Sequence, residues 1–298
     1  MKTTNLTLML LTLSGLSNNA FADIDAIKAS NNQVSIQYVN TNVDYTENVD
    51  GLIADTEKAQ IHGIGLSISV MKDLFFGNDY LYASFTRLNG NTRSTGSSYV
   101  DAVYPTFYMP GHYGTLQRSD NFQSTDFSAR YGKGIEINQT FLMTPYIEAG
   151  YHEWHRGIGT SPIDTYGSTP ITSEKYTNGY FGIGLMGQLS PISNVVLTTN
   201  AFVGRTIGAN ILVKGAGTAP FTTSEGSQDL GDSTIYRFGV SADYAFTRRI
   251  HGNVGVDYTS FDYGKSNDFI PSNSGTAIYE PNSETHYTTL KLGIGYAF

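Results

Sequence analysis

The chain of 298 residues contains no cysteine, and only 15% of its residues are charged. Without cysteine, an exported protein cannot be stabilised by disulfide bonds, so its rigidity has to come from another source. Beyond residue 22 there is no run of eighteen apolar residues, which excludes a helical membrane protein. The net charge of −8 argues against nucleic-acid binding, because the phosphate backbone selects for a basic surface.

Tyrosine (21), phenylalanine (16) and glycine (32) are abundant, as are serine, threonine and asparagine. This composition favours β-structure. A closed, hydrogen-bonded β-barrel would supply the rigidity that disulfides cannot, because it leaves no backbone group unpaired inside a membrane.

The N-terminus has the features of a secretory signal peptide. Lys2 gives a short positive region, Leu6 to Leu16 form an apolar core, and Ala20-Phe21-Ala22 is a small-x-small cleavage site. A transmembrane anchor is disfavoured, because the apolar stretch is too short and no stop-transfer charge cluster follows it. The sequence therefore predicts a signal peptide at 1–22, cleaved near Ala22, and one barrel domain at 23–298.

About ten segments alternate between apolar and small or polar residues, each roughly as long as a tilted membrane-spanning strand. In segment 61–71, for example, Ile64, Leu66 and Ile68 alternate with glycine and serine. The segments are 34–40, 61–71, 80–88, 122–133, 145–154, 176–188, 195–206, 235–246, 251–263 and 291–298.

The connections between these segments alternate in length. Four are short (72–79, 134–144, 189–194 and 247–250), and the others are long (near 41–60, 89–121, 155–175, 207–234 and 264–286). Short periplasmic turns and long extracellular loops are typical of outer-membrane barrels. We therefore predict an all-β fold: a closed antiparallel up-and-down transmembrane barrel of about ten strands, with eight or twelve possible. A soluble β-sandwich is disfavoured, because the inward faces carry glycine, serine and charge.

The C-terminal strand carries a second signal. Lys291, Gly293, Tyr296 and Phe298 place a polar residue, a glycine and two aromatics at spacings that resemble the terminal β-signal of bacterial outer-membrane β-barrels. The whole chain also resembles the porin-like and opacity-type barrel families in architecture. The resemblance implies recognition by the barrel assembly machinery and a location in the bacterial outer membrane.

Charged residues with inward parity predict a network in the lumen. If one hairpin is centred near residue 139, Arg130 lies opposite Glu148, and Asp126 lies opposite His152. Further inward charges from other strands are Arg237, Asp243, Asp257 and Lys291. We favour a salt-bridge network that fills a narrow barrel, because buried charges are usually paired. The alternative makes Asp126 and His152 a general base.

Ten-stranded barrels include the omptin proteases, and that family takes an Asp–His pair from an Asp-x-His motif. The present chain has no such motif, and Asp257-Tyr258-Thr259 lacks the histidine. Segment 152–156 (HEWHR) places its two histidines on opposite faces of a strand, which does not suit zinc. That segment is instead interpreted as a charged and aromatic rim. We expect a non-enzymatic protein with no metal site and no cofactor.

Two arginines near the outer ends of their strands, Arg87 and Arg205, are in phase with the lipid face. They could bind lipopolysaccharide phosphates, or they could be ordinary solvated rim charges. The segment 41–60 is interpreted as a solvated acidic loop. Segment 99–113 is rich in exposed-type aromatics, which suits either recognition or folding into the barrel mouth.

The leading functional hypothesis is a non-enzymatic surface barrel whose loops contact host or envelope components, with outer-membrane lipid and lipopolysaccharide around it. The alternatives are a narrow passive channel for small solutes and, third, a barrel hydrolase.

Overall fold

The computed structural model describes residues 24–49, 51–97, 113–158, 171–215, 224–267 and 279–298. The predicted signal peptide and most of the aromatic segment 99–113 lie outside these residues. The elements are α1 (Ile24–Ser30), β1 (Gln33–Val49), β2 (Leu52–Lys72), β3 (Asp79–Ser97), β4 (Tyr113–Lys133), β5 (Ile135–Asn138), β6 (Phe141–Gly157), β7 (Ile171–Ile192), β8 (Val195–Gly215), β9 (Ser224–Asp229), β10 (Thr234–Ala245), β11 (Ile250–Tyr263) and β12 (Asn282–Ala297). No helix among the described residues is long and apolar enough to cross a membrane.

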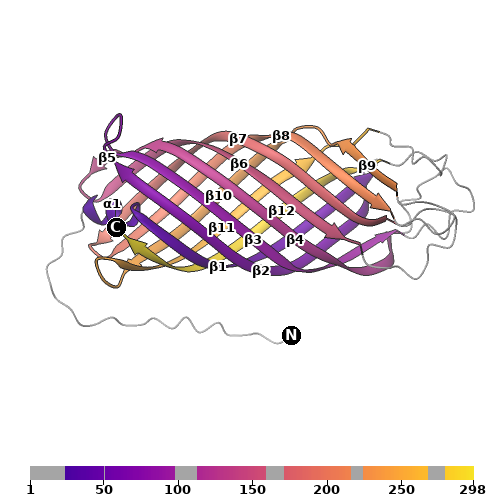
Figure 1. Ribbon diagram of the computed structural model, residues 1–298, viewed down its shortest axis with the longest axis horizontal. Coiled ribbons are helices and arrows are strands. Elements are labelled where there is room, and N and C mark those ends of the chain that lie inside the picture. The colour runs from indigo at the N-terminus through magenta and orange to yellow at the C-terminus, as the bar shows by residue number, and fades with distance from the viewer. Residues whose placement is uncertain (1–23, 50, 98–112, 159–170, 216–223, 268–278) are drawn as a thin grey trace, which may run out of the picture.

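Ten of the strands form a closed antiparallel barrel (Figure 1). The ring runs β1-β2-β3-β4-β6-β7-β8-β10-β11-β12 and closes where β12 pairs with β1. Strands β5 and β9 lie outside the ring, because β5 pairs with the start of β6 and β9 pairs with the end of β8. The prediction of about ten antiparallel strands is confirmed.

The outer face of the ring carries a continuous apolar band. On β6, Ile147 is 47% exposed while its neighbour Glu148 is fully buried, and the other strands alternate in the same way. On β12 the exposed apolar positions run from Leu290 to Phe298. Nine residues are about the length that a tilted strand needs to cross a bilayer. The band therefore has the size and composition of the lipid-facing surface of a transmembrane barrel.

The two ends of the barrel differ. We call the end with α1, Phe298 and the short turns the turn end, and the opposite end the loop end (Figure 1). Several strands continue well past the apolar band toward the loop end. The interpretation of 41–60 as a loop is wrong, because β1 and β2 pair without a break from Asn42↔Gln60 to Glu47↔Asp55. The outward residues of this paired stretch are polar. The alternation of apolar and polar residues that marks a lipid-facing strand is therefore lost, although the strand continues.

Helix α1 occupies the barrel at its turn end, and the sequence analysis did not anticipate it. Ile27 is fully buried. Just after the helix, the Asn31 side chain donates to Gln188 of β7 at 2.6 Å, and Asn32 exchanges hydrogen bonds with the backbone of Met71 in β2. These contacts hold the helix against two separate parts of the wall.

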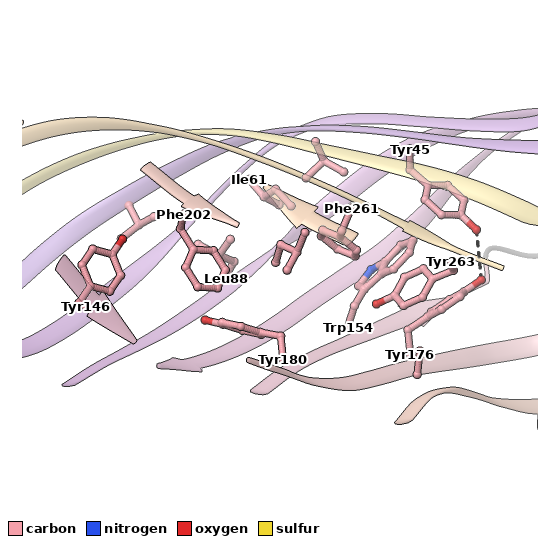
Figure 2. Packing of buried hydrophobic residues seen from close by; sticks show 14 of the residues in the cluster. Tyr45, Ile61, Leu88, Tyr146, Trp154, Tyr176, Tyr180, Phe202, Phe261 and Tyr263 are labelled. Atoms are coloured by element: carbon pink, nitrogen blue, oxygen red, sulfur yellow. Dashed lines mark hydrogen bonds between the residues drawn. The ribbon is translucent and has the colours of Figure 1, made fainter. Parts of the chain in front are cut away.

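The core of this protein lies inside the ring rather than between layers. Figure 2 shows a run of buried aromatic and aliphatic side chains along the lumen, from Tyr146 and Phe202 to Tyr45 and Tyr176. Polar side chains lie between these rings, so the lumen alternates between apolar and charged layers.

Candidate functional site

Glu148 is the centre of a buried charge network in the part of the lumen that the apolar band surrounds. Its Oε2 accepts from Arg130 Nε of β4 at 2.6 Å, and its Oε1 accepts from Arg237 Nη1 of β10 at 2.5 Å. The Tyr180 hydroxyl of β7 also donates to Oε1 at 3.1 Å. One carboxylate thus binds two guanidinium groups and ties four strands together across the barrel. We call this set the Glu148 network.

Aromatic rings cover both guanidinium groups. The Arg130 guanidinium lies 4.9 Å from the ring centres of both Tyr82 and Tyr146, and that of Arg237 lies 5.4 Å from Phe202. A cation that loses water on burial recovers part of the loss from the electron-rich face of such rings. The rings also fill the space around the charges, so the network is both paired and packed.

The other inward charges form separate pairs. Lys291 and Asp257 make a salt bridge at 2.7 Å between β12 and β11. Asp243 binds His251 Nδ1 at 2.6 Å near the turn end. The predicted residues all face inward, but Asp243 belongs to a different part of the lumen from Glu148. They form several local pairs rather than one continuous network.

Asp126 and His152 face each other across β4 and β6, in the register that the sequence predicts. Asp126 Oδ1 lies 2.6 Å from His152 Nδ1. The imidazole is 4% exposed and packs edge-on against Phe261, and its Nε2 has no hydrogen-bond partner within the described chain. The Asp126 side chain is 42% exposed, so some solvent space remains on its side of the lumen.

An aromatic layer follows this pair on the side of the loop end, and Figure 2 shows four of its rings, Tyr45, Trp154, Tyr176 and Tyr263. The Trp154 ring stacks on Tyr176 at 4.8 Å and meets Tyr45 edge-on at 5.1 Å. Phe122 and Tyr263 complete the layer, each 5.4 Å from one of these rings. Such arrangements are favourable beyond the apolar area that they bury. The layer crosses the lumen from β1 to β7.

A second charge network lies beyond the aromatic layer, inside the loop end. We call it the Arg156 network. It combines two guanidinium groups with six carboxyl groups, all of them buried or nearly so. Its members are Arg118, Arg156, Glu47, Asp55, Glu57, Asp120, Glu174 and Glu280.

Arg156 is the hub of this network. Its Nη1 lies 2.9 Å from Glu174 and 3.3 Å from Glu47, its Nη2 lies 3.0 Å from Asp55, and its Nε contacts Glu57. The arginine comes from β6 and the carboxylates from β1, β2 and β7. A planar guanidinium suits this role, because its fork of donors can bind several carboxylates at once.

Two tyrosines of the aromatic layer donate hydrogen bonds to acidic side chains of the network. The Tyr45 hydroxyl donates to Glu47 at 3.0 Å and to Glu280 at 3.2 Å. Tyr176 donates to Glu280 at 2.6 Å. These bonds attach the segment before β12, which carries Glu280, to the neighbouring strand β1 and to β7 across the lumen.

The Arg156 network lies outside the apolar band. The outward neighbours of its members are Asp44 and Lys58 on β1 and β2, Glu153 and His155 on β6, and Lys175 on β7. Charged side chains on the outer face at this height would not suit the hydrocarbon of a bilayer. We therefore treat the network as lying in the part of the barrel that projects from the membrane.

Burial raises the pKa of Glu47 and of Glu57 to about 7, and nearby carboxylates add to the effect. Burial likewise raises the pKa of Asp55, and raises that of Glu280 well above its ordinary value. Burial is the main cause of these shifts, and repulsion among six carboxyl groups that share only two guanidinium groups adds to it. These raised pKa values favour protonated carboxyl groups in the network near neutral pH.

No pattern in the sequence indicated this network. Glu47, Asp55 and Glu57 were predicted to lie in a solvated loop, and Trp154 and Arg156 were predicted to form part of a rim. All five side chains are buried inside the barrel. The signal that could have found them is parity, since Arg156 is in phase with inward residues of its own strand.

Arg87 and Arg205, which were predicted to be in phase with the lipid face, lie on the outer face of the barrel. They are at the height where β3 and β8 extend beyond the apolar band. Arg87 follows the exposed Phe85 by two residues, and its guanidinium donates to Thr125 and to Gln123 of β4, the latter at 2.9 Å. Arg205 follows the exposed Val203 by two residues and is itself exposed. They lie on separate strands, so they do not form one site.

The terminal strand is built into the wall along its length. A side chain at Gly293 would meet Asn253, Gln37 and the Ile36 carbonyl at 2.6–2.7 Å, so the register leaves no room for one. Tyr296 and Phe298 are exposed at 43% and 56% on the outer face. The lysine and glycine of the motif therefore have structural roles inside the barrel, and the aromatics lie on its outside.

Within the described residues, no group of three or more histidine, aspartate or glutamate side chains has the geometry to hold a metal ion. The acidic side chains of the Arg156 network are instead arranged around a guanidinium group.

No protein-family model matches the chain, and no curated protein matches it in sequence. Solved structures do. The outer-membrane protease OmpT from Escherichia coli aligns with a TM-score of 0.56 at 12% identity, over 90% of this chain and 98% of that one. OprG from Pseudomonas aeruginosa (TM-score 0.37, 10% identity, 90% and 97%) and Ail of Yersinia pestis (0.33, 11%, 90% and 99%) also align.

The chain has the fold of bacterial outer-membrane β-barrel proteins. This confirms the resemblance that the terminal strand and the loop pattern indicated. At 12% identity the likeness to OmpT shows the fold alone, and it transfers no activity to this chain.

Proposed function

We propose that this protein is a non-enzymatic outer-membrane barrel of the bacterial cell surface. The side chains that close its lumen stabilise the part of the wall that projects from the membrane, and this part presents loops to host or envelope components. The observation that carries the proposal is the series of buried layers in the lumen. From the turn end these are α1, the Glu148 network, the aromatic layer and the Arg156 network.

The layers favour a scaffold over a channel. A passive pore needs a continuous wet path, and Glu148, Trp154 and Arg156 are each buried at a different level of the lumen. Barrels of about eight strands are filled by their own side chains, whereas sixteen or more leave an aqueous channel. Ten strands lie near the filled end of that range.

The projecting wall favours a role at the cell surface. The Arg156 network fixes β1, β2, β6 and β7 to one another above the apolar band, where no lipid supports them. A rigid rim is what a surface protein needs to hold long loops in place, because loops carry recognition when a rigid scaffold positions them. In this orientation the loop end is extracellular and the turn end is periplasmic.

Lipid and assembly partners follow from the same orientation. Arg87 and Arg205 lie where outer-leaflet phosphates would be, and the Arg87 guanidinium is held in place by its contacts to β4. The exposed aromatics Tyr296 and Phe298 remain available to the barrel assembly machinery before the strand is paired.

An enzymatic role is disfavoured by burial. The Asp126–His152 pair has the geometry of an oriented imidazole, but a general base has to reach its substrate. His152 Nε2 is enclosed by the barrel and its aromatic neighbours.

Planar-bilayer recording of the purified, folded protein tests the proposal. We expect no stable conductance steps from the wild type, with a known porin as the positive control. Reproducible channels of constant size would overturn the closed-lumen proposal and favour the channel. Hydrolysis of phospholipid or peptide that is lost in His152→Ala would overturn the non-enzymatic assignment.

A further inference from the structure

The turn between β2 and β3 presents the most exposed large apolar side chains among the described residues. Phe75 is 76% exposed and Phe76 is 69% exposed, and Leu74 beside them is 47% exposed. Single exposed apolar residues need no explanation, but three in a row on one turn form a patch that water disfavours. The patch lies at the turn end, beyond the last residue of β2.

A buried carboxylate fixes the shape of this turn. Asp79 Oδ2 accepts hydrogen bonds from the backbone N–H groups of Leu74, Phe75 and Phe76 at 3.0, 2.7 and 2.9 Å. Asp79 Oδ1 accepts from the Tyr131 hydroxyl of β4 at 2.8 Å. Three consecutive backbone donors on one oxygen leave the turn little freedom, so the two rings are held out in a set direction.

The far side of the turn is fixed as well. Asp73 Oδ1 accepts from the Asn78 backbone N–H at 2.7 Å. Gly77 and Asn78 have φ of 76° and 51°, values that few other residues adopt without strain. A turn built in this way does not fold back to cover its own phenylalanines.

The position of the turn indicates what covers the patch. In Figure 1 the turn stands clear of the barrel wall beside β5, and it joins strands whose outward residues, such as Ile68 and Leu81, belong to the apolar band. The Lys133 ammonium lies 5.9 Å from the Phe76 ring centre, and Lys72 lies 5.7 Å from that of Phe298. Aromatic rings beside lysines are typical of the headgroup region of a membrane.

We propose that Leu74, Phe75 and Phe76 insert into the phospholipid leaflet around the turn end, with Lys72 and Lys133 facing its phosphate groups. The patch continues the lipid-facing band, and two of the charges beside it, Lys72 and Lys133, are complementary to phosphate. This inference rests on the membrane location proposed above. It adds a lipid anchor on a turn, separate from the aromatic residues of the strands.

The absence of cysteine makes the test direct, because one introduced cysteine gives one label. Phe75→Cys and Phe76→Cys would carry a nitroxide in vesicles of phosphatidylethanolamine and phosphatidylglycerol. Collision rates with oxygen, which concentrates in lipid, and with a water-soluble nickel chelate would be compared. Gln139→Cys, on the exposed β5–β6 turn of the same end, is the aqueous control, and Ile147→Cys is the lipid reference.

We expect the labels at 75 and 76 to match the reference at 147, with an oxygen-to-nickel ratio several-fold above that at 139. Adding Asp79→Asn should reduce this ratio, because the turn loses its fixed shape. The lipid anchor would be overturned if the labels at 75 and 76 collided with the nickel chelate as often as the label at 139 while the label at 147 remained in lipid. The turn would then be a contact surface for a soluble partner. A label at 147 open to nickel would instead overturn the proposed membrane location.

Discussion

The two charge networks inside this barrel are opposite in composition. The Glu148 network has one carboxylate between two guanidinium groups, and aromatic rings cover the cations. The Arg156 network has six carboxyl groups around two guanidinium groups, and tyrosine hydroxyls cap its acids. The first lies within the apolar band and the second beyond it.

The difference shows how position governs buried charge in a barrel. Within the apolar band, two guanidinium groups share the Glu148 carboxylate and are covered by aromatic rings, because the wall there offers neither water nor counterions. Above the membrane, a network can keep an excess of acidic groups by retaining protons. The comparison predicts that the two networks respond differently to mutation and to pH.

The largest effect should come from Arg156→Met. The substitution keeps much of the side-chain volume but leaves the surrounding carboxyl groups without their common partner. Breaking a buried ion pair from one side costs about 3–5 kcal/mol, and proton uptake should offset part of this. Urea unfolding of the detergent-folded barrel would measure the loss, and protease cleavage at the loop end would locate it. A change below about 1 kcal/mol would show that Arg156 does not hold the wall together.

Glu148→Ala should rank next, at about 3 kcal/mol, because it leaves both Arg130 and Arg237 without their acceptor. Adding Arg130→Ala should recover less than half of the loss, since Arg237 remains unpaired. Further replacement of Arg237 by methionine should recover more. The same unfolding assay, arranged as a double-mutant cycle, gives the coupling between the three side chains. Independent, additive effects would contradict the shared-acceptor arrangement.

The pH response should separate the networks. In the folded state the pKa of Glu47 and Glu57 is raised from an ordinary 4.5 to about 7. A raised pKa favours the folded state while the group is protonated, so this stabilisation is complete below pH 4.5 and is lost as pH rises through about 7. Hydrogen-exchange protection at the loop end, taken relative to the intrinsic exchange rate at each pH, should therefore be lower at pH 8.5 than at pH 6. Glu57→Gln should reduce the difference between the two pH values. A loop end that is equally protected at pH 6 and pH 8.5 in the wild type would contradict this prediction.

The smallest effect should come from the exposed pair Lys175 and Glu153, which lies on the outer face at the height of Arg156. Solvent screens this pair, so Lys175→Met should change stability by about 0.5 kcal/mol or less. The pair is a matched control for Arg156, because both substitutions remove one cation from neighbouring strands. Equal losses at the two positions would mean that burial does not set the strength of the network.

Much of the barrel was predictable from period-2 alternation. The parity of Ile147 and Glu148 fixed which face met lipid, and hairpin symmetry placed Arg130 opposite Glu148 and Asp126 opposite His152. Local pattern was sufficient because lipid forces a strict division between the faces of each strand.

The rest was not predictable, for three physical reasons. Above the apolar band the outer face of a strand is polar and the inner face mixes apolar with acidic residues, so 41–60 has the composition of a loop although it is a hairpin. The contacts of Arg156 join strands that are distant in sequence, and no local spacing records them. Helix α1 is a third case, since seven residues give too short a pattern to distinguish from a loop.

Infrared spectroscopy of the carboxyl groups tests the contrast between the two networks most directly. The carbonyl band of protonated carboxylic acids would be followed from pH 5.5 to 8.5 in the wild type, Glu57→Gln and Glu148→Gln. Protonated acids in the Arg156 network predict a band that loses intensity as pH passes through about 7. This loss should be smaller in Glu57→Gln and unchanged in Glu148→Gln. A wild-type spectrum with no titration near pH 7, or a band that Glu148→Gln removes, would contradict the account.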